Sequence, residues 1–192
     1  MAEPRLPLPD YAELCCVSNY SFLQGASHPE ELVQRAAALG YRALAITDEC
    51  SVAGVVRAHV ACRDPAVQAS GLQLQVGSRF RVTDETGQTR FTLVVLAADL
   101  LGWGQLCEFI TRLRRASPVK GQYRLTQDLI DGEALAGCVV LALPERDLDD
   151  AALQDLARWL LRHFTGRCWW GVSLLRALDD ERWLEQIGRA HV

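Results

Sequence analysis

The sequence predicts an α/β fold in which a mostly parallel sheet curves like a barrel. About six apolar segments of strand length alternate with amphipathic helical segments, which is the order expected of a parallel β/α barrel. Some of these strands, such as residues 43–47, are continuously apolar, as strands buried on both faces are. Of the 192 residues, 49% are hydrophobic and 23% are charged, so the chain can bury a sizeable core.

Residues 11–59 predict a strand-helix-strand unit followed by the start of another helix. The two strands are expected at 11–17 and 43–47. Ser27 is the expected cap of the intervening helix, which ends at Gly40. The second strand places Asp48 and Glu49 at the carboxyl end of a parallel strand, where α/β proteins carry their chemistry.

The remaining segments continue the alternation. We expect helices at 53–61, 103–115, 149–164 and 179–188, a short helix at 126–130, and strands at 72–82, 91–97, 137–143 and 167–174. The strands at 72–82 and 91–97 are expected to form a hairpin. Residues 63–71 are expected to be a connector, and residues 1–10, with three prolines, an extended lead-in.

Charge and cysteine content restrict the class of protein. A formal net charge of −4 provides no global basic field, so the chain by itself is a poor candidate for strong nucleic-acid binding. Seven cysteines at irregular spacing, with no Cys-x-x-Cys, favour reduced thiols. No apolar run of membrane-spanning length and no leader are evident, so we expect a cytoplasmic protein without a membrane partner.

A family resemblance is carried by residues 18–59, which read SNYSFLQGASHPEELVQRAAALGYRALAITDECSVAGVVRAH. This segment resembles the start of the PHP (polymerase and histidinol phosphatase) domain of bacterial C-family DNA polymerases, relatives of the polymerase III α-subunit. Residues 120–130, KGQYRLTQDLI, resemble the error-prone branch of that family. The resemblance implies a PHP-type distorted barrel over residues 11–192, truncated here, with the polymerase palm, fingers and thumb outside this chain.

The resemblance also locates the positions of the PHP metal site. They fall on Cys15, Val17, Gln24, Asp48, Glu49 and Arg79. Val17 has no donor atom, and Arg79 places a fixed positive charge where a cation would lie. We therefore expect a degenerate site without metal, in which Arg79 forms an ion pair with Asp48 or Glu49. If any metal binds, Asp48, Glu49 and Cys15 are the candidate ligands.

The cysteines and one histidine near this site leave alternatives open. Adjacent Cys15 and Cys16 point to opposite faces of a strand, which favours two small hydrophobic residues over a shared soft-metal or redox site. A zinc site from Cys15, Cys50 and Asp48 is a weaker alternative. His59 either faces the cleft, as a histidine of the family does, or has an ordinary exposed or core position.

One local basic cluster stands out in the second half of the chain. It consists of Arg112, Arg114, Arg115, Lys120 and Arg124, together with Tyr123. These side chains could contact DNA phosphates or another polymerase domain. The alternative is a solvated helix end whose cations favour the helix dipole.

The resemblance implies that the parent protein is an error-prone DNA polymerase, a nucleotidyltransferase active in translesion synthesis, DNA repair and damage-induced mutagenesis. The remaining polymerase domains, DNA, deoxynucleotides, the sliding clamp and mutagenesis accessory proteins would be its partners, with Mg²⁺ as its cofactor. This fragment is expected to be a non-catalytic scaffold without a cofactor of its own. The alternatives are a metal-dependent phosphoesterase acting on a phosphate ester or a DNA 3′ end, and a module used only for protein interaction.

Overall fold

The computed structural model describes residues 10–174 and 176–190, so most of the predicted lead-in at 1–10 lies outside the described residues. The strands are β1 (Ala12–Cys16), β2 (Ala43–Ile46), β3 (Gln73–Thr83), β4 (Thr89–Ala97), β5 (Cys138–Pro144) and β6 (Cys168–Trp170). The α-helices are α1 (Pro29–Ala38), α2 (Val55–Ala61), α3 (Pro65–Ser70), α4 (Leu100–Ala116), α5 (Asp150–His163) and α6 (Asp180–Arg189). Two short 3-10 helices, η1 (Gln127–Leu129) and η2 (Glu133–Leu135), precede β5.

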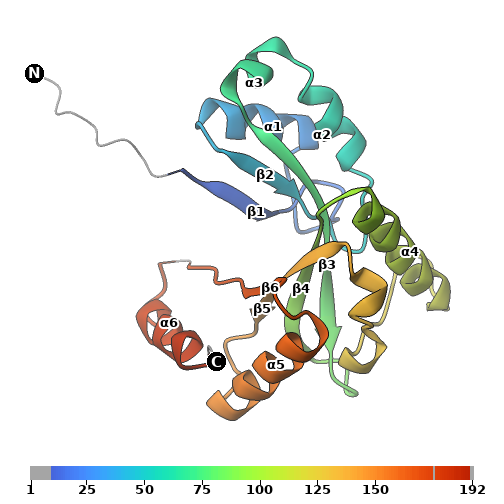
Figure 1. The fold of residues 1–192 in the computed structure, drawn as a ribbon, viewed down its shortest axis with the longest axis vertical. Coiled ribbons are helices and arrows are strands. Elements are labelled where there is room, and N and C mark those ends of the chain that lie inside the picture. The colour runs from blue at the N-terminus through green and yellow to red at the C-terminus, as the bar shows by residue number, and fades with distance from the viewer. Residues whose placement is uncertain (1–9, 175, 191–192) are drawn as a thin grey trace, which may run out of the picture.

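The six strands form one curved sheet in chain order, from β1 at one end to β6 at the other (Figure 1). Three neighbouring pairs are parallel, and the two pairs that involve β4 are antiparallel. Helices α1, α2 and α3 lie beside the β1–β2 end of the sheet, and α5 and α6 lie beside the β5–β6 end (Figure 1). The predicted α/β class, the half-closed barrel and the β3–β4 hairpin are therefore confirmed.

Strand β3 changes partner halfway along its length. Residues 73–76 pair with β2, and residues 77–83 pair with β4. Beyond the end of β2, a segment that follows α4 lies along the vacated edge of β3, where the Thr83 backbone N–H donates to the Leu125 carbonyl at 2.8 Å. This segment carries Tyr123 to the carboxyl end of β2.

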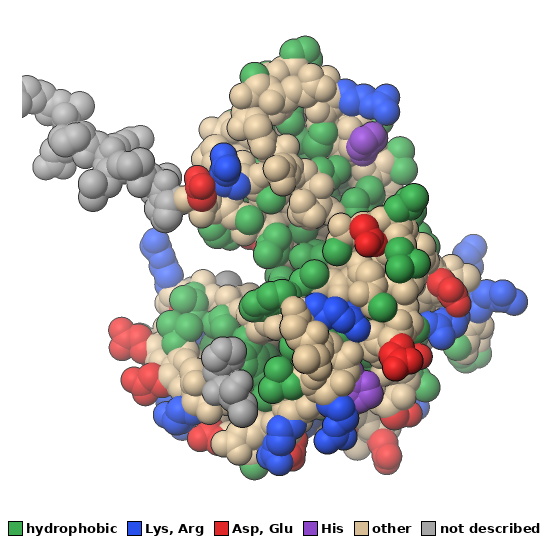
Figure 2. Space-filling model, viewed as in Figure 1, with side chains coloured by type: hydrophobic (Ala, Val, Ile, Leu, Met, Phe, Trp, Pro, Cys, Tyr) green, Lys and Arg blue, Asp and Glu red, His purple; other side chains and the backbone are tan. Residues whose placement is uncertain are grey.

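Apolar side chains form separate clusters on the faces of the sheet. The main core joins β3, β4 and β5 to α4 and α5, and a second cluster joins β2 to α1 and α2. A third cluster, around Ala45, Val94 and Leu141, has Cys15 packed against it. In Figure 2, hydrophobic side chains gather between the part of the molecule with α1–α3 and the part with α5 and α6. Within the described residues, no helix is long and apolar enough to cross a membrane.

Several local predictions need correction. The predicted connector at 63–71 contains α3, because the Asp64 carboxylate accepts the Ala66 N–H and Pro65 opens the helix. The cap of α1 is His28 rather than Ser27, and its N–H donates to Glu31 at 2.8 Å, the reciprocal half of a capping box. Strand β6 is shorter than the predicted 167–174.

Candidate functional site at the carboxyl ends of the strands

Asp48 lies fully buried just beyond β2, held by the loop that follows β1. Its Oδ1 accepts the Ser18 backbone N–H at 2.9 Å and the Ser21 hydroxyl at 2.8 Å. Its Oδ2 accepts the Ser18 hydroxyl at 2.7 Å. Both carboxylate oxygens therefore accept hydrogen bonds from donors of this chain, and these bonds stabilise the buried side chain.

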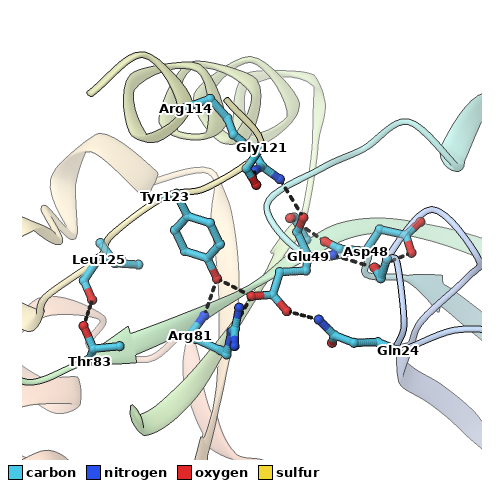
Figure 3. Close-up of polar contacts among 11 residues, drawn as sticks. Gln24, Asp48, Glu49, Arg81, Thr83, Arg114, Gly121, Tyr123 and Leu125 are labelled. Carbon is cyan, nitrogen blue, oxygen red and sulfur yellow. Dashed lines mark hydrogen bonds and ion pairs between the residues drawn. The ribbon is translucent and has the colours of Figure 1, made fainter. Parts of the chain in front are cut away.

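Glu49 is the centre of a polar network that joins three parts of the chain (Figure 3). Its Oε2 accepts the Gln24 amide at 2.5 Å. Its Oε1 accepts the Arg81 Nε–H at 2.6 Å and the Tyr123 hydroxyl at 2.7 Å. The Tyr123 hydroxyl also accepts the Arg81 backbone N–H at 2.7 Å, so it satisfies a donor on the open edge of β3.

The environment shifts the protonation equilibria of this network. Burial disfavours the ionised Glu49 carboxylate, but the hydrogen bonds from Gln24, Tyr123 and Arg81 outweigh it and lower the pKa of Glu49. Burial, together with the Glu49 charge, raises the pKa of Tyr123, so its hydroxyl stays protonated and donates. The network therefore holds one ionised carboxylate with three donors.

The lowered pKa of Glu49 predicts an acid-sensitive contribution to stability. Since the folded-state pKa lies below the unfolded value of about 4.3, the ionised carboxylate stabilises the fold above that value, and the stabilisation is lost as the pH falls through the folded pKa. Glu49→Gln should therefore cost stability at neutral pH, and the difference from the wild type should shrink on acidification. Urea unfolding between neutral and acidic pH measures it, and a difference independent of pH would contradict the assignment.

The predicted ion pair of Arg79 with Asp48 or Glu49 is wrong, because Arg81 takes that role. The backbones of Glu49 and Arg79 are paired directly across the strands, and the Glu49 side chain reaches two residues further along β3 to Arg81. The Arg79 guanidinium points toward β1, where Nη2 donates to the Cys15 carbonyl at 3.2 Å. Its buried Nε has no hydrogen-bond partner among the described residues.

The other predicted site positions have mixed outcomes. Gln24 reaches Glu49, whereas Val17 is half-buried and His59 is exposed on α2, where its ring lies 3.4 Å from Arg63. Cys15 and Cys16 pack against different apolar clusters, as predicted for opposite faces of a strand. Cys50 belongs to the main core, so the structure does not unite it with Cys15.

The predicted basic cluster does not form one surface. Arg114 turns inward and donates to the carbonyls of Glu49, Cys50 and Gly121. Lys120 lies at the rim of the same region. The other three do not line this region: Arg112 lies 3.9 Å from Glu108, Arg124 donates to the Glu85 carbonyl, and Arg115 is exposed on α4. On the face drawn in Figure 2, acidic and basic side chains are interspersed.

A cleft of about 630 Å³ opens beside Glu49. The loop at residues 20–24 forms one wall, the segment 120–123 forms the other, and Glu49, Arg81 and Arg114 line the space between them. This volume lies within the range of about 300–1,000 Å³ that is typical of sites for small molecules. We call this feature the Glu49 cleft.

The donor set does not fit the metal centre that the PHP resemblance implies. Divalent metals need several carboxylate or imidazole ligands with free lone pairs. Among residues 10–174 and 176–190, no group of three or more His, Cys, Asp or Glu side chains could hold a metal ion. Asp48 and Glu49 already accept three hydrogen bonds each, and Arg81 supplies a positive charge beside Glu49.

Sequence reasoning did not assign four residues to this site, although it placed Tyr123 in the basic cluster. Ser18, Ser21, Arg81 and Tyr123 hold the two carboxylates. A signal for Arg81 was present, because residues two apart on a strand share a face and Arg79 had already been assigned to the site. The roles of the serines and of Tyr123 depend on loops whose paths no periodicity encodes.

Comparison with known proteins identifies the family. Residues 13–167 match the PHP domain family. The chain is 49% identical to an "Error-prone DNA polymerase" of Ralstonia nicotianae over 90% of its length, and 48% identical to one of Pseudomonas aeruginosa over 92%. It spans 16% of the length of each of these relatives.

A solved structure supports the fold. An amidohydrolase from Chromobacterium violaceum, described with bound SO4 and no metal, superposes with a TM-score of 0.65 at 17% identity, covering 93% of this chain and 83% of that one. At this identity, the likeness concerns the fold alone. The family match over residues 13–167 shows that the chain belongs to the PHP domain family.

Proposed function

We propose that this chain is the N-terminal PHP domain of an error-prone DNA polymerase, in which the domain serves as a scaffold without catalytic metals. The observation that carries the proposal is the identity of 49% to a polymerase of that name, combined with a site whose two carboxylates each accept three hydrogen bonds from the protein. The whole enzyme would extend primers on damaged templates, as a nucleotidyltransferase in translesion synthesis and repair.

The polar network around Glu49 supports the scaffold proposal. Glu49 connects the loop after β1, strand β3 and the segment after α4, and Arg114 of α4 donates to the carbonyls of residues 49 and 50. These bonds hold the loop after β1, strand β3 and the segment after α4 together at one end of the sheet. Bound metals stabilise the same kind of arrangement in a metalloprotein. Hydrogen bonds of this kind keep the domain ordered without a metal. They provide no metal-activated water for the cleavage of a phosphoester.

The proposed partners and cofactor are those of the whole polymerase. The remaining polymerase domains, DNA and deoxynucleotides follow from the polymerase assignment, with Mg²⁺ held by carboxylates of the polymerase domains. A sliding clamp, mutagenesis accessory proteins and a cytoplasmic location belong to the same proposal and rest on the resemblance alone.

Metal analysis tests the scaffold proposal. The purified chain should contain substoichiometric divalent metal by plasma mass spectrometry, and it should not hydrolyse bis(p-nitrophenyl) phosphate when Mn²⁺ or Zn²⁺ is added. The matched variant Cys15→His/Val17→His/Arg79→Glu restores the ligand types of the family and should gain metal affinity. Stoichiometric metal in the wild type, with hydrolysis that Glu49→Gln abolishes, would instead support a metal-dependent phosphoesterase.

A further inference from the structure

The Glu49 cleft contains more positive than negative charge. Three cationic side chains, Arg81, Arg114 and Lys120, line it together with one carboxylate, Glu49. Arg81 pairs with Glu49 through Nε, while its side chain remains 59% exposed. Among the described residues, no carboxylate lies within ion-pair distance of Arg114 or Lys120, and Arg114 donates to backbone carbonyls instead.

Two of the three cations, Arg81 and Arg114, are held in place by contacts within the chain. The Arg114 guanidinium donates to the Glu49 and Cys50 carbonyls at 3.2 Å and to the Gly121 carbonyl at 2.5 Å. It also lies 5.6 Å from the centre of the Tyr123 ring. Arg81 is fixed by Glu49 at 2.6 Å. Fixed charges of this kind lose little conformational entropy when an anion binds.

Aromatic side chains form the opposite wall of the cleft. Phe22 is 84% exposed and Tyr20 is 43% exposed, both on the loop that follows β1. A phenylalanine with most of its surface in water gains little for the stability of the fold itself. Beside cations, such rings suit a ligand that combines negative charge with a flat apolar face.

We propose that the Glu49 cleft binds a nucleotide unit of single-stranded DNA without a metal and without cleaving it. The phosphate lies against Arg81, Arg114 and Lys120, and the base stacks on Phe22. This inference rests on the proposed function in one respect: the fixed cations, rather than metal ions, supply the positive charge. An acidic peptide would satisfy the cations but would leave the flat rings without a stacking partner.

Fluorescence anisotropy with a labelled oligothymidylate, in buffer that contains EDTA, tests the proposal on the full chain. Phe22→Ala should weaken binding by about 5-fold or more, the loss expected for one base–aromatic stack. Lys120→Gln should reduce the slope of log K against log salt by about 0.7, the loss of one phosphate contact on a single strand. The matched controls, Leu100→Ala and Arg112→Gln, alter an exposed apolar residue and a cation of α4 outside the cleft and should change neither quantity.

Competition experiments identify the source of the ligand. Displacement of the oligonucleotide by dTMP, but not by equimolar inorganic phosphate, would support a site for the nucleotide unit. Equal competition by a polyglutamate peptide of the same charge, an unchanged affinity in Phe22→Ala, or no binding in EDTA would each overturn the proposal. Bound stoichiometric metal together with EDTA-resistant DNA binding would contradict the scaffold proposal alone, so the two failures are distinguishable.

Discussion

Replacing Asp48 with alanine is expected to lower the free energy of unfolding by about 4 kcal/mol, since buried donors to a charged acceptor are left without a partner. The Ser18 N–H, the Ser18 hydroxyl and the Ser21 hydroxyl all donate to this fully buried carboxylate. The Ser21 hydroxyl in turn accepts the Glu49 N–H at 2.8 Å. Loss of Asp48 therefore loosens the loop after β1 and, through it, the position of Glu49.

Urea unfolding monitored by circular dichroism measures this loss. Asp155→Ala removes a carboxylate that is 76% exposed and should change the free energy of unfolding by less than about 0.5 kcal/mol. Asp48→Asn keeps the shape and one acceptor oxygen and should lie between the two. The loss in Asp48→Ala should be the same with and without EDTA. A loss that disappears when EDTA is added to both proteins would show that Asp48 acts through a bound metal.

Structural features that depend on residues close together in the chain could be predicted from the sequence. Apolar residues recur at helical spacing along α4 and α5, and most of them form the buried faces: Leu106, Phe109, Leu153 and Leu160 lie inside, whereas Leu161 is exposed. The position of Asp48 and Glu49 at the end of β2 followed from the continuous apolar run before them. The fold class and the position of the two carboxylates beyond β2 could therefore be predicted from sequence.

The contacts within the site could not be predicted, because they join segments far apart in the chain. Glu49 meets Tyr123 only because the segment after α4 lies along the free edge of β3. The choice of Arg81 over Arg79 depends on how far the Glu49 side chain leans along the strand, which is a matter of register and rotamer. Neither leaves a periodic trace in the sequence.

Gly25→Ala is expected to destabilise the domain by about 3 kcal/mol, at the upper end of the cost of forcing extra atoms into a packed region. A Cβ at this position would lie 2.1 Å from the Ser18 carbonyl oxygen and 2.4 Å from its carbonyl carbon. The loop has little room to relax, because the Asn19 N–H donates to the Ser27 carbonyl at 2.9 Å and closes it into a compact turn. Any outward shift of Ser18 breaks the two hydrogen bonds that Ser18 donates to Asp48.

Because Gly25→Ala and Asp48→Ala both act on Ser18, a double variant tests whether the two effects are coupled. Gly104→Ala is the matched control, since its Cβ meets no atom within 4 Å on α4 and the substitution should stabilise the helix by up to about 1 kcal/mol. In Gly25→Ala/Asp48→Ala the two losses should be less than additive, because each variant already breaks the contact of Ser18 with Asp48. Strict additivity would mean that the crowding at Gly25 is relieved elsewhere and that the loop does not transmit it to Asp48.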